Sequence, residues 1–162
     1  MKDKVVLIMG SSKDEEFSRS ICAMLKKFGF SYEIRVCSAH KAASKLLKMI
    51  GDYEKSGDRI VYITVAGRSN ALSGLVDANT RYPVIACPPP SEKFGLVDLF
   101  SSLRMPSGVA PLVVLEPENA VFAVAKIFAL SNPEINVKIL NYHQLAEKKI
   151  EMDDDKIRNR EM

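Results

Sequence analysis

The sequence has few of the residues from which disulfide frameworks and metal centres are built. Its 162 residues include three cysteines, Cys22, Cys37 and Cys87, without a CxxC pair, and two histidines, His40 and His143. An odd cysteine count argues against a disulfide framework and for a reducing compartment, and two histidines argue against a multi-histidine metal centre. We therefore expect a cytoplasmic protein with no metal.

Long apolar runs and a strong charge imbalance are also missing. No run approaches the roughly 18 apolar residues that cross a bilayer, and residues 5–9 are too short for a signal-peptide core. Lys and Arg number 23 against 20 Asp and Glu, and these charges are dispersed rather than gathered in the basic stripe that nucleic acid requires. We expect neither a membrane nor a nucleic acid as a partner.

What remains is an ordinary globular composition, with 47% hydrophobic and 27% charged residues. A chain of this length buries a substantial core and usually forms one domain. No linker or internal repeat suggests a second domain. We expect a single α/β domain over residues 1–152, followed by a frayed polar tail over residues 153–162.

Short apolar, β-branched segments alternate with helical patterns along the chain. Strands are expected at residues 4–9, 31–36, 59–65, 83–87 and 112–115. Helices are expected at residues 15–28, from about 46 to near 57, towards 80, and at 96–103, 117–130 and about 134–151. Parallel neighbouring strands need crossover helices, so this order predicts a three-layer αβα sandwich with a central parallel sheet, flavodoxin-like, plus a C-terminal helix.

The loops that follow the first four strands carry the candidate chemistry. In open parallel sheets, ligands bind beyond the carboxyl ends of the strands. These loops, 10–14, 38–41, 66–74 and 88–91, collect glycines, hydroxyls and cations, which suit a phosphate group. Because the GxxxxGK[ST] and GxGxxG patterns of nucleotide-binding loops are absent, one phosphate on a small ligand is the simpler interpretation.

Five side chains near these loops can be interpreted individually. His40 is the only histidine there, and an ordinary pKa near roughly 6.5 suits it to proton exchange. Asp14 is either the N-cap of the following helix or an acceptor for ribose hydroxyls. Lys41 is expected in the first turn of a helix, where its positive charge is mildly unfavourable beside the positive end of the helix dipole. A nearby anion would remove this misfit. Cys37 and Cys87 lack a histidine and acid pair, so both are interpreted as small hydrophobic residues.

Five motifs can be taken together: Met9–Asp14 (MGSSKD), Ser38–Lys41 (SAHK), Ala66–Asn70 (AGRSN), Pro83–Pro89 (PVIACPP) and Ser101–Gly108 (SSLRMPSG). In this order and spacing they resemble the PurE family of purine biosynthesis, from about residue 4 to residue 130. SAHK and AGRSN are similar to the class that carboxylates 5-aminoimidazole ribonucleotide (AIR) directly with carbon dioxide. The other class, with SAHR and an AG-x-x-AHLPG loop, is a mutase. Both classes make 4-carboxy-5-aminoimidazole ribonucleotide (CAIR).

The resemblance implies a reversible carboxylase in de novo purine biosynthesis, with no cofactor and a homo-octameric assembly. His40 is then the catalytic residue, and the substrate-binding residues are Gly10, Ser11, Asp14, Ser38, Lys41, Ala66, Gly67, Ser69, Asn70 and Ala71. The last three would frame the carbon dioxide pocket. The chain departs from the family at Lys13, where a small hydroxyl residue is usual, and at Ala42 and Ala43, where glycine and proline often stand.

Two rival functions remain to be compared with this one. A class I type mutase would convert the N-carboxy isomer of AIR to CAIR. A non-catalytic binding module would share the alternating strands and helices. A receiver module needs an aspartate at the end of the third strand, where this chain has Ala66 and Gly67, and a flavin carrier wants aromatic rings that the first three loops lack.

Overall fold

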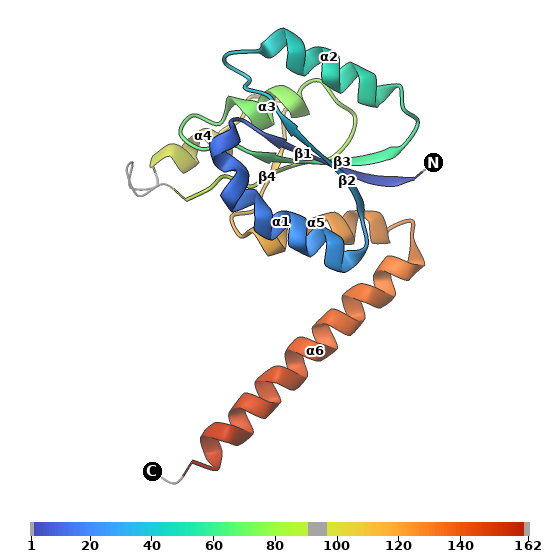
Figure 1. Ribbon diagram of the computed structural model, residues 1–162, viewed down its shortest axis with the longest axis vertical. Helices are drawn as coiled ribbons and strands as arrows, with labels where there is room; N and C mark the ends of the chain where they lie inside the picture. Colours follow the sequence, from blue (N-terminus) through green and yellow to red (C-terminus); the bar gives the residue numbers. More distant parts are fainter. Residues whose placement is uncertain (1, 91–96, 161–162) are drawn as a thin grey trace. The chain divides into compact units, whose positions relative to one another are not determined.

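A five-stranded parallel sheet forms the centre of the protein, in the order β2-β1-β3-β4-β5 (Figure 1). The computed structural model describes residues 2–90 and 97–160. Its strands are β1 (Asp3–Met9), β2 (Ser31–Val36), β3 (Arg59–Val65), β4 (Val84–Ala86) and β5 (Leu112–Val113). The predicted parallel, flavodoxin-like sheet is confirmed.

Helices cover both faces of this sheet (Figure 1). On one face lie α2 (Ala43–Glu54) and α3 (Ala71–Asp77). On the other lie α1 (Glu15–Phe28) and residues 117–124 of α5 (Pro117–Ala129). Short helical turns η1 (Ser12–Asp14), η3 (Val97–Leu99) and α4 (Phe100–Leu103) complete this part of the chain. The predicted helix at 96–103 is thus a 3-10 turn followed by one α-helical turn, and its first residue lies outside the described residues.

The core is densest around β1, the middle of the three longest strands. Val5, Val6, Leu7 and Ile8 have no exposed surface, because β2 and β3 flank the strand while helices cover its two faces. A parallel strand buried on both faces has a continuous apolar sequence rather than an alternating one. Residues 5–9 of the strand therefore present no polar side chain, and the next polar side chain is that of Ser11, just after the strand ends.

The C-terminal helix α6 (Pro133–Arg158) is longer than predicted. It begins at the N-cap Asn132, whose side chain accepts a hydrogen bond from the Glu134 amide. The expectation of a frayed tail from residue 153 is wrong as far as Arg158. Two ion pairs join residues one helical turn apart: Lys156 with Asp153 at 3.3 Å, and Arg158 with Asp154 at 3.8 Å. Each favours the helix by a few tenths of a kcal/mol.

The chain divides into two compact units, one up to Val124 and one from Ala125 onward. The boundary lies within α5. The predicted single domain over residues 1–152 stays a prediction. The sheet and every residue of the candidate site belong to the first unit.

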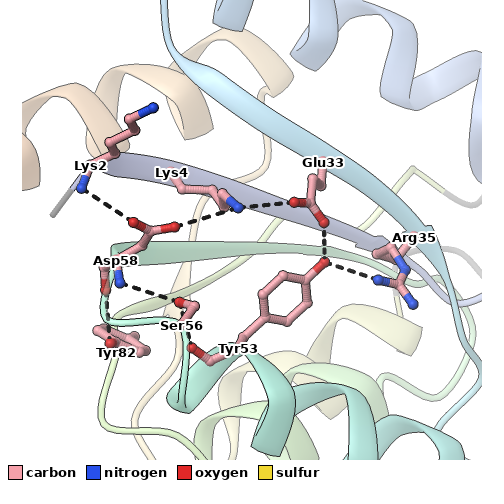
Figure 2. A network of polar contacts seen from close by, with 8 residues as sticks. All are labelled: Lys2, Lys4, Glu33, Arg35, Tyr53, Ser56, Asp58 and Tyr82. Atoms are coloured by element: carbon pink, nitrogen blue, oxygen red, sulfur yellow. Dashed lines mark hydrogen bonds and ion pairs between the residues drawn. The ribbon is translucent and has the colours of Figure 1, made fainter.

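A polar network joins elements near the amino ends of β1 and β3 (Figure 2). Lys4 Nζ lies 2.9 Å from Glu33 Oε1 and 3.5 Å from Asp58 Oδ2. The Tyr53 hydroxyl donates to Glu33 Oε2 at 2.6 Å and accepts from Arg35 Nη1 at 3.1 Å. These contacts tie α2 to β2, on which Glu33 and Arg35 lie.

Candidate active site

The loops after β1, β2 and β3 surround one cavity of about 460 Å³. Every predicted site residue except Asn70 and Ala71 lines this cavity. Its lining residues are Gly10, Ser11, Lys13, Asp14, Ser38, Ala39, His40, Lys41, Ala66, Gly67, Arg68, Ser69, Leu72, Pro89 and Pro90. No individual role was predicted for Arg68, Leu72, Pro89 or Pro90, although Arg68 and Pro89 belong to two of the five motifs.

The loop after β1 is shaped by a pair of reciprocal hydrogen bonds. The Lys13 amide donates to Ser11 Oγ at 3.2 Å, and the Ser11 amide donates to Asp14 Oδ2 at 2.9 Å. Asp14 precedes α1, but its side chain makes no capping bond to that helix. Burial raises the pKa of the Asp14 carboxyl, and the bond from Ser11 opposes that shift. The carboxylate has capacity for further donors, such as the hydroxyls of a sugar.

The loop after β2 presents the imidazole. The Lys41 amide donates to Ser38 Oγ at 3.3 Å, and the Ala42 amide donates to the Ser38 carbonyl at 2.9 Å. This tight turn holds His40 and Lys41 next to each other with their side chains accessible to solvent. A ligand in the cavity can therefore meet the imidazole and the ammonium group together.

Glycine permits the close approach of the first and third loops. The Gly10 amide donates to the Val65 carbonyl at 2.8 Å, and a Cβ atom on Gly10 would lie 3.3 Å from Cβ of Ala66. A Cβ atom on Gly67 would lie 3.4 Å from Cγ of Pro89. A side chain at either position would crowd the neighbouring loop, so glycine at these positions allows the loops to pack closely.

The charge of the cavity is suited to an anion. Among the residues that the structure describes, Lys13, Lys41 and Arg68 line it against a single carboxylate, that of Asp14. A phosphate monoester carries about −1.5 to −2 charges at neutral pH, which this excess of cations would balance. Lys13, which departs from the family pattern, therefore adds positive charge where the ligand is expected.

Asn70 and Ala71 lie at a neighbouring cavity of about 390 Å³, which Ser69 also lines. The Asn70 side chain is 2% exposed and is occupied within the protein. Its Oδ1 accepts from the Ser73 amide at 3.2 Å, and its Nδ2 donates to Ser102 Oγ at 2.8 Å. The structure thus brings Ser69 to the main cavity and turns the neighbouring asparagine inward.

The two cysteines near the site are buried, as predicted for small hydrophobic residues: Cys37 is 3% exposed and Cys87 is not exposed at all. Burial raises the pKa of Cys87 to about 12, so this thiol stays protonated at neutral pH. Within residues 2–90 and 97–160 there is no group of three His, Cys, Asp or Glu side chains arranged to hold a metal ion. The same residues include no helix long and apolar enough to cross a membrane.

The sheet and the cavity at its carboxyl edge define a flavodoxin-like α/β protein with its polar site where such folds bind ligands. Comparison with known proteins defines the family. The family described as AIR carboxylase matches residues 4–149. The chain therefore belongs to the AIR carboxylase family, and the prediction of a PurE-type carboxy-lyase of purine biosynthesis is confirmed.

Individual relatives agree with this assignment. A phosphoribosylaminoimidazole carboxylase of Archaeoglobus fulgidus is 52% identical over 155 residues, which cover 96% of this chain and 85% of that protein. The phosphoribosylaminoimidazole carboxylase of Treponema denticola is 46% identical, with 98% of this chain and 99% of that protein covered. The crystal structure of Treponema denticola PurE superimposes with a TM-score of 0.95 at 46% identity and covers 98% of this chain and 100% of that one.

Proposed function

We propose that this protein carboxylates AIR directly with carbon dioxide to give CAIR, and that it also catalyses the reverse reaction. The observation that carries the proposal is the single cavity in which the three post-strand loops meet. In the part of the chain that the structure describes, one imidazole, three cations and one carboxylate line it. This combination suits a ribose monophosphate whose base lies beside a proton-accepting group.

The ligand would be held mainly by the first two loops. Ser11, Ser38 and Lys41 are the groups proposed to bind the phosphate, because hydroxyls and an ammonium donate to its oxygens. Asp14 is proposed to accept from the ribose hydroxyls. A carboxylate beside the phosphate itself would be repelled, so the sugar is the more favourable partner for Asp14.

The chemical step needs positioning and one proton transfer. The aminoimidazole ring of AIR is an enamine, so its nucleophilic ring carbon attacks the carbon of carbon dioxide. A carbon–carbon bond forms, and one C=O electron pair moves to oxygen. The attacking ring carbon then carries both a hydrogen and the new carboxylate, and His40 removes the hydrogen as a proton, which restores the aromatic ring. Ser69 and nearby loop amides are proposed to donate to the developing carboxylate.

The test supplies purified protein with AIR and bicarbonate in one reaction and with the N-carboxy isomer of AIR in another. Formation of CAIR from AIR in proportion to dissolved carbon dioxide supports the proposal. Turnover of the isomer alone would identify a mutase and overturn it. Incubation of CAIR with the enzyme should release carbon dioxide, since the reaction is reversible.

Assembly and location are parts of the same proposal. We propose a homo-octamer in the cytoplasm, as the family resemblance implies. Support comes from α6, on which Leu140, Leu145, Ile150 and Ile157 are each more than half exposed in the single chain. Exposed apolar side chains in such number favour a protein interface. Light scattering should give a mass of about 144 kDa, eight times the chain mass of 18.0 kDa, and a mass of one chain would contradict the octamer.

A further inference from the structure

The loop 67–70 contains a residue in an unusual backbone conformation. Arg68 has a φ of +60°, and it is the only residue other than glycine with a positive φ in the part of the chain that the structure describes. A side chain in this left-handed region costs about 1–2 kcal/mol relative to ordinary backbone, so surrounding contacts must hold it there. Arg68 and Ser69, the next residue, both line the main cavity.

The contacts that hold this loop come from a distant part of the sequence. Ser101 Oγ accepts a hydrogen bond from the Asn70 amide at 2.8 Å and lies 3.4 Å from the Arg68 carbonyl. The Ser101 hydroxyl also donates to the Asp98 carbonyl, with 2.6 Å between the two oxygen atoms. Ser101 therefore joins the turn at residues 97–99 to both sides of Ser69.

A second contact fixes the side chain of Asn70. Its Nδ2 donates to Ser102 Oγ at 2.8 Å, and Ser102 is 1% exposed. Its Oδ1 accepts from the Ser73 amide in the first turn of α3. These two hydrogen bonds hold the Asn70 side chain in one orientation, because breaking either of them leaves a buried donor or acceptor unpaired.

We infer that Asn70, Ser101 and Ser102 are positioning residues that hold Arg68 and Ser69 at the wall of the active cavity. None of the three lines that cavity. The inference rests on the proposed function, since Ser69 is the group that would meet the new carboxylate. The groups proposed to contact the phosphate and the ribose directly, Ser11, Asp14, Ser38 and Lys41, lie on the other two loops. Losing this hydrogen-bonded clamp should therefore slow the chemical step and leave those contacts to AIR in place.

The test compares Ser101→Ala with a matched control, Ser56→Ala. Ser56 Oγ makes the same two kinds of bond, donating to the Tyr53 carbonyl at 2.8 Å and accepting from the Asp58 amide at 3.2 Å. It precedes β3, whereas the cavity lies beyond the other end of that strand. We expect Ser101→Ala to lower kcat by about 10- to 100-fold, the cost of misplacing a reacting group by about 1 Å, with KM for AIR changed by less than about two-fold. Ser56→Ala should keep the wild-type kcat.

Two further variants separate positioning from a general loss of structure. Ser101→Thr keeps the hydroxyl and should restore most of the activity. Ser102→Ala removes only the bond to the Asn70 side chain and should give the same split between kcat and KM, which keeps the inference testable if Ser101→Ala does not fold.

The outcomes are distinguishable from those of the proposed function. Wild-type protein that turns over neither AIR nor CAIR overturns both proposals. Active wild-type protein with kcat values for Ser101→Ala and Ser102→Ala equal to that of Ser56→Ala overturns the positioning role alone. A rise in KM for AIR at constant kcat would also overturn it, because the loop would then act in binding.

Discussion

Replacing Tyr53 with phenylalanine should destabilise the protein in a way that depends on pH. The hydroxyl of Tyr53 donates to the Glu33 carboxylate at 2.6 Å and accepts from Arg35 at 3.1 Å (Figure 2). The ring itself is 8% exposed and packs edge-on against Tyr62, with ring centroids 6.2 Å apart, so Tyr53→Phe leaves the packing in place. The change therefore isolates the two hydrogen bonds.

The magnitude follows from the exposure of the carboxylate. A hydrogen bond to a charged group contributes about 1.5–3 kcal/mol when it is well shielded. The Glu33 side chain is 43% exposed, so water replaces part of the lost contact, and we expect a loss of about 1 kcal/mol in the free energy of unfolding. For a chain of this size, that loss lowers the Tm by about 2–4 °C.

The pH dependence comes from Glu33. The hydrogen bond from Tyr53, and after it the bond from Lys4, holds the pKa of the Glu33 carboxyl below its ordinary value of 4.5. A lowered folded-state pKa stabilises the fold above the ordinary value, and this contribution disappears as the pH falls through the folded-state pKa. The destabilisation by Tyr53→Phe should thus be complete at pH 7 and smaller below about pH 4.5.

Urea unfolding of wild-type and variant protein between pH 4 and pH 7 measures this difference. Tyr82→Phe is the matched control, since the Tyr82 hydroxyl also accepts from an arginine, Arg81, but donates at 2.8 Å to a neutral acceptor, the Asp58 carbonyl. Its effect should not vary over this pH range. An effect of Tyr53→Phe that is absent at pH 7, or equally large at every pH, would refute the reasoning.

Three further changes test the site. His40→Asn should lower kcat by about 100- to 10,000-fold while calorimetric binding of AIR is retained, and near-normal turnover would exclude His40 from the mechanism. Lys41→Ala should weaken AIR binding by about 1.5–3 kcal/mol through loss of a charge-assisted contact, whereas an unchanged dissociation constant would mean that Lys41 does not contact the ligand. Gly10→Ala brings a Cβ atom to 3.3 Å from Ala66 and should cost about 1 kcal/mol by overpacking, which calorimetry would record as a Tm lower by about 2–4 °C; an unchanged Tm would show that the loops have room to separate.

The fold was predictable because each element has a strong local signal. β1 has a continuous apolar run, and α1 ends where predicted, at Gly29, which adopts a φ of +75°. The extent of α6 was not predictable in the same way. The acidic and basic residues after position 152 have the composition of a frayed tail, but two pairs of them lie one helical turn apart, which favours the helix slightly.

The location of the candidate site was predictable because ligands bind beyond the carboxyl ends of the strands in open parallel sheets. Loops that follow neighbouring strands meet at one edge, so Ser11, Ser38 and Ser69 were expected together and lie together. The orientation of Asn70 was not predictable. Its partners are 31 and 32 residues further along the chain, and nothing in the local sequence indicates whether its amide faces a ligand or a buried serine.

The position of Ser101 and Ser102 in the chain affects the order in which the site is completed. Every described residue that lines the cavity lies at or before position 90, so during synthesis these residues leave the ribosome before the two serines do. A nascent chain that stops short of α4 has the complete set of wall residues but lacks the partners of Asn70. The third loop therefore has all the hydrogen-bond partners that define its geometry only once α4 is in place.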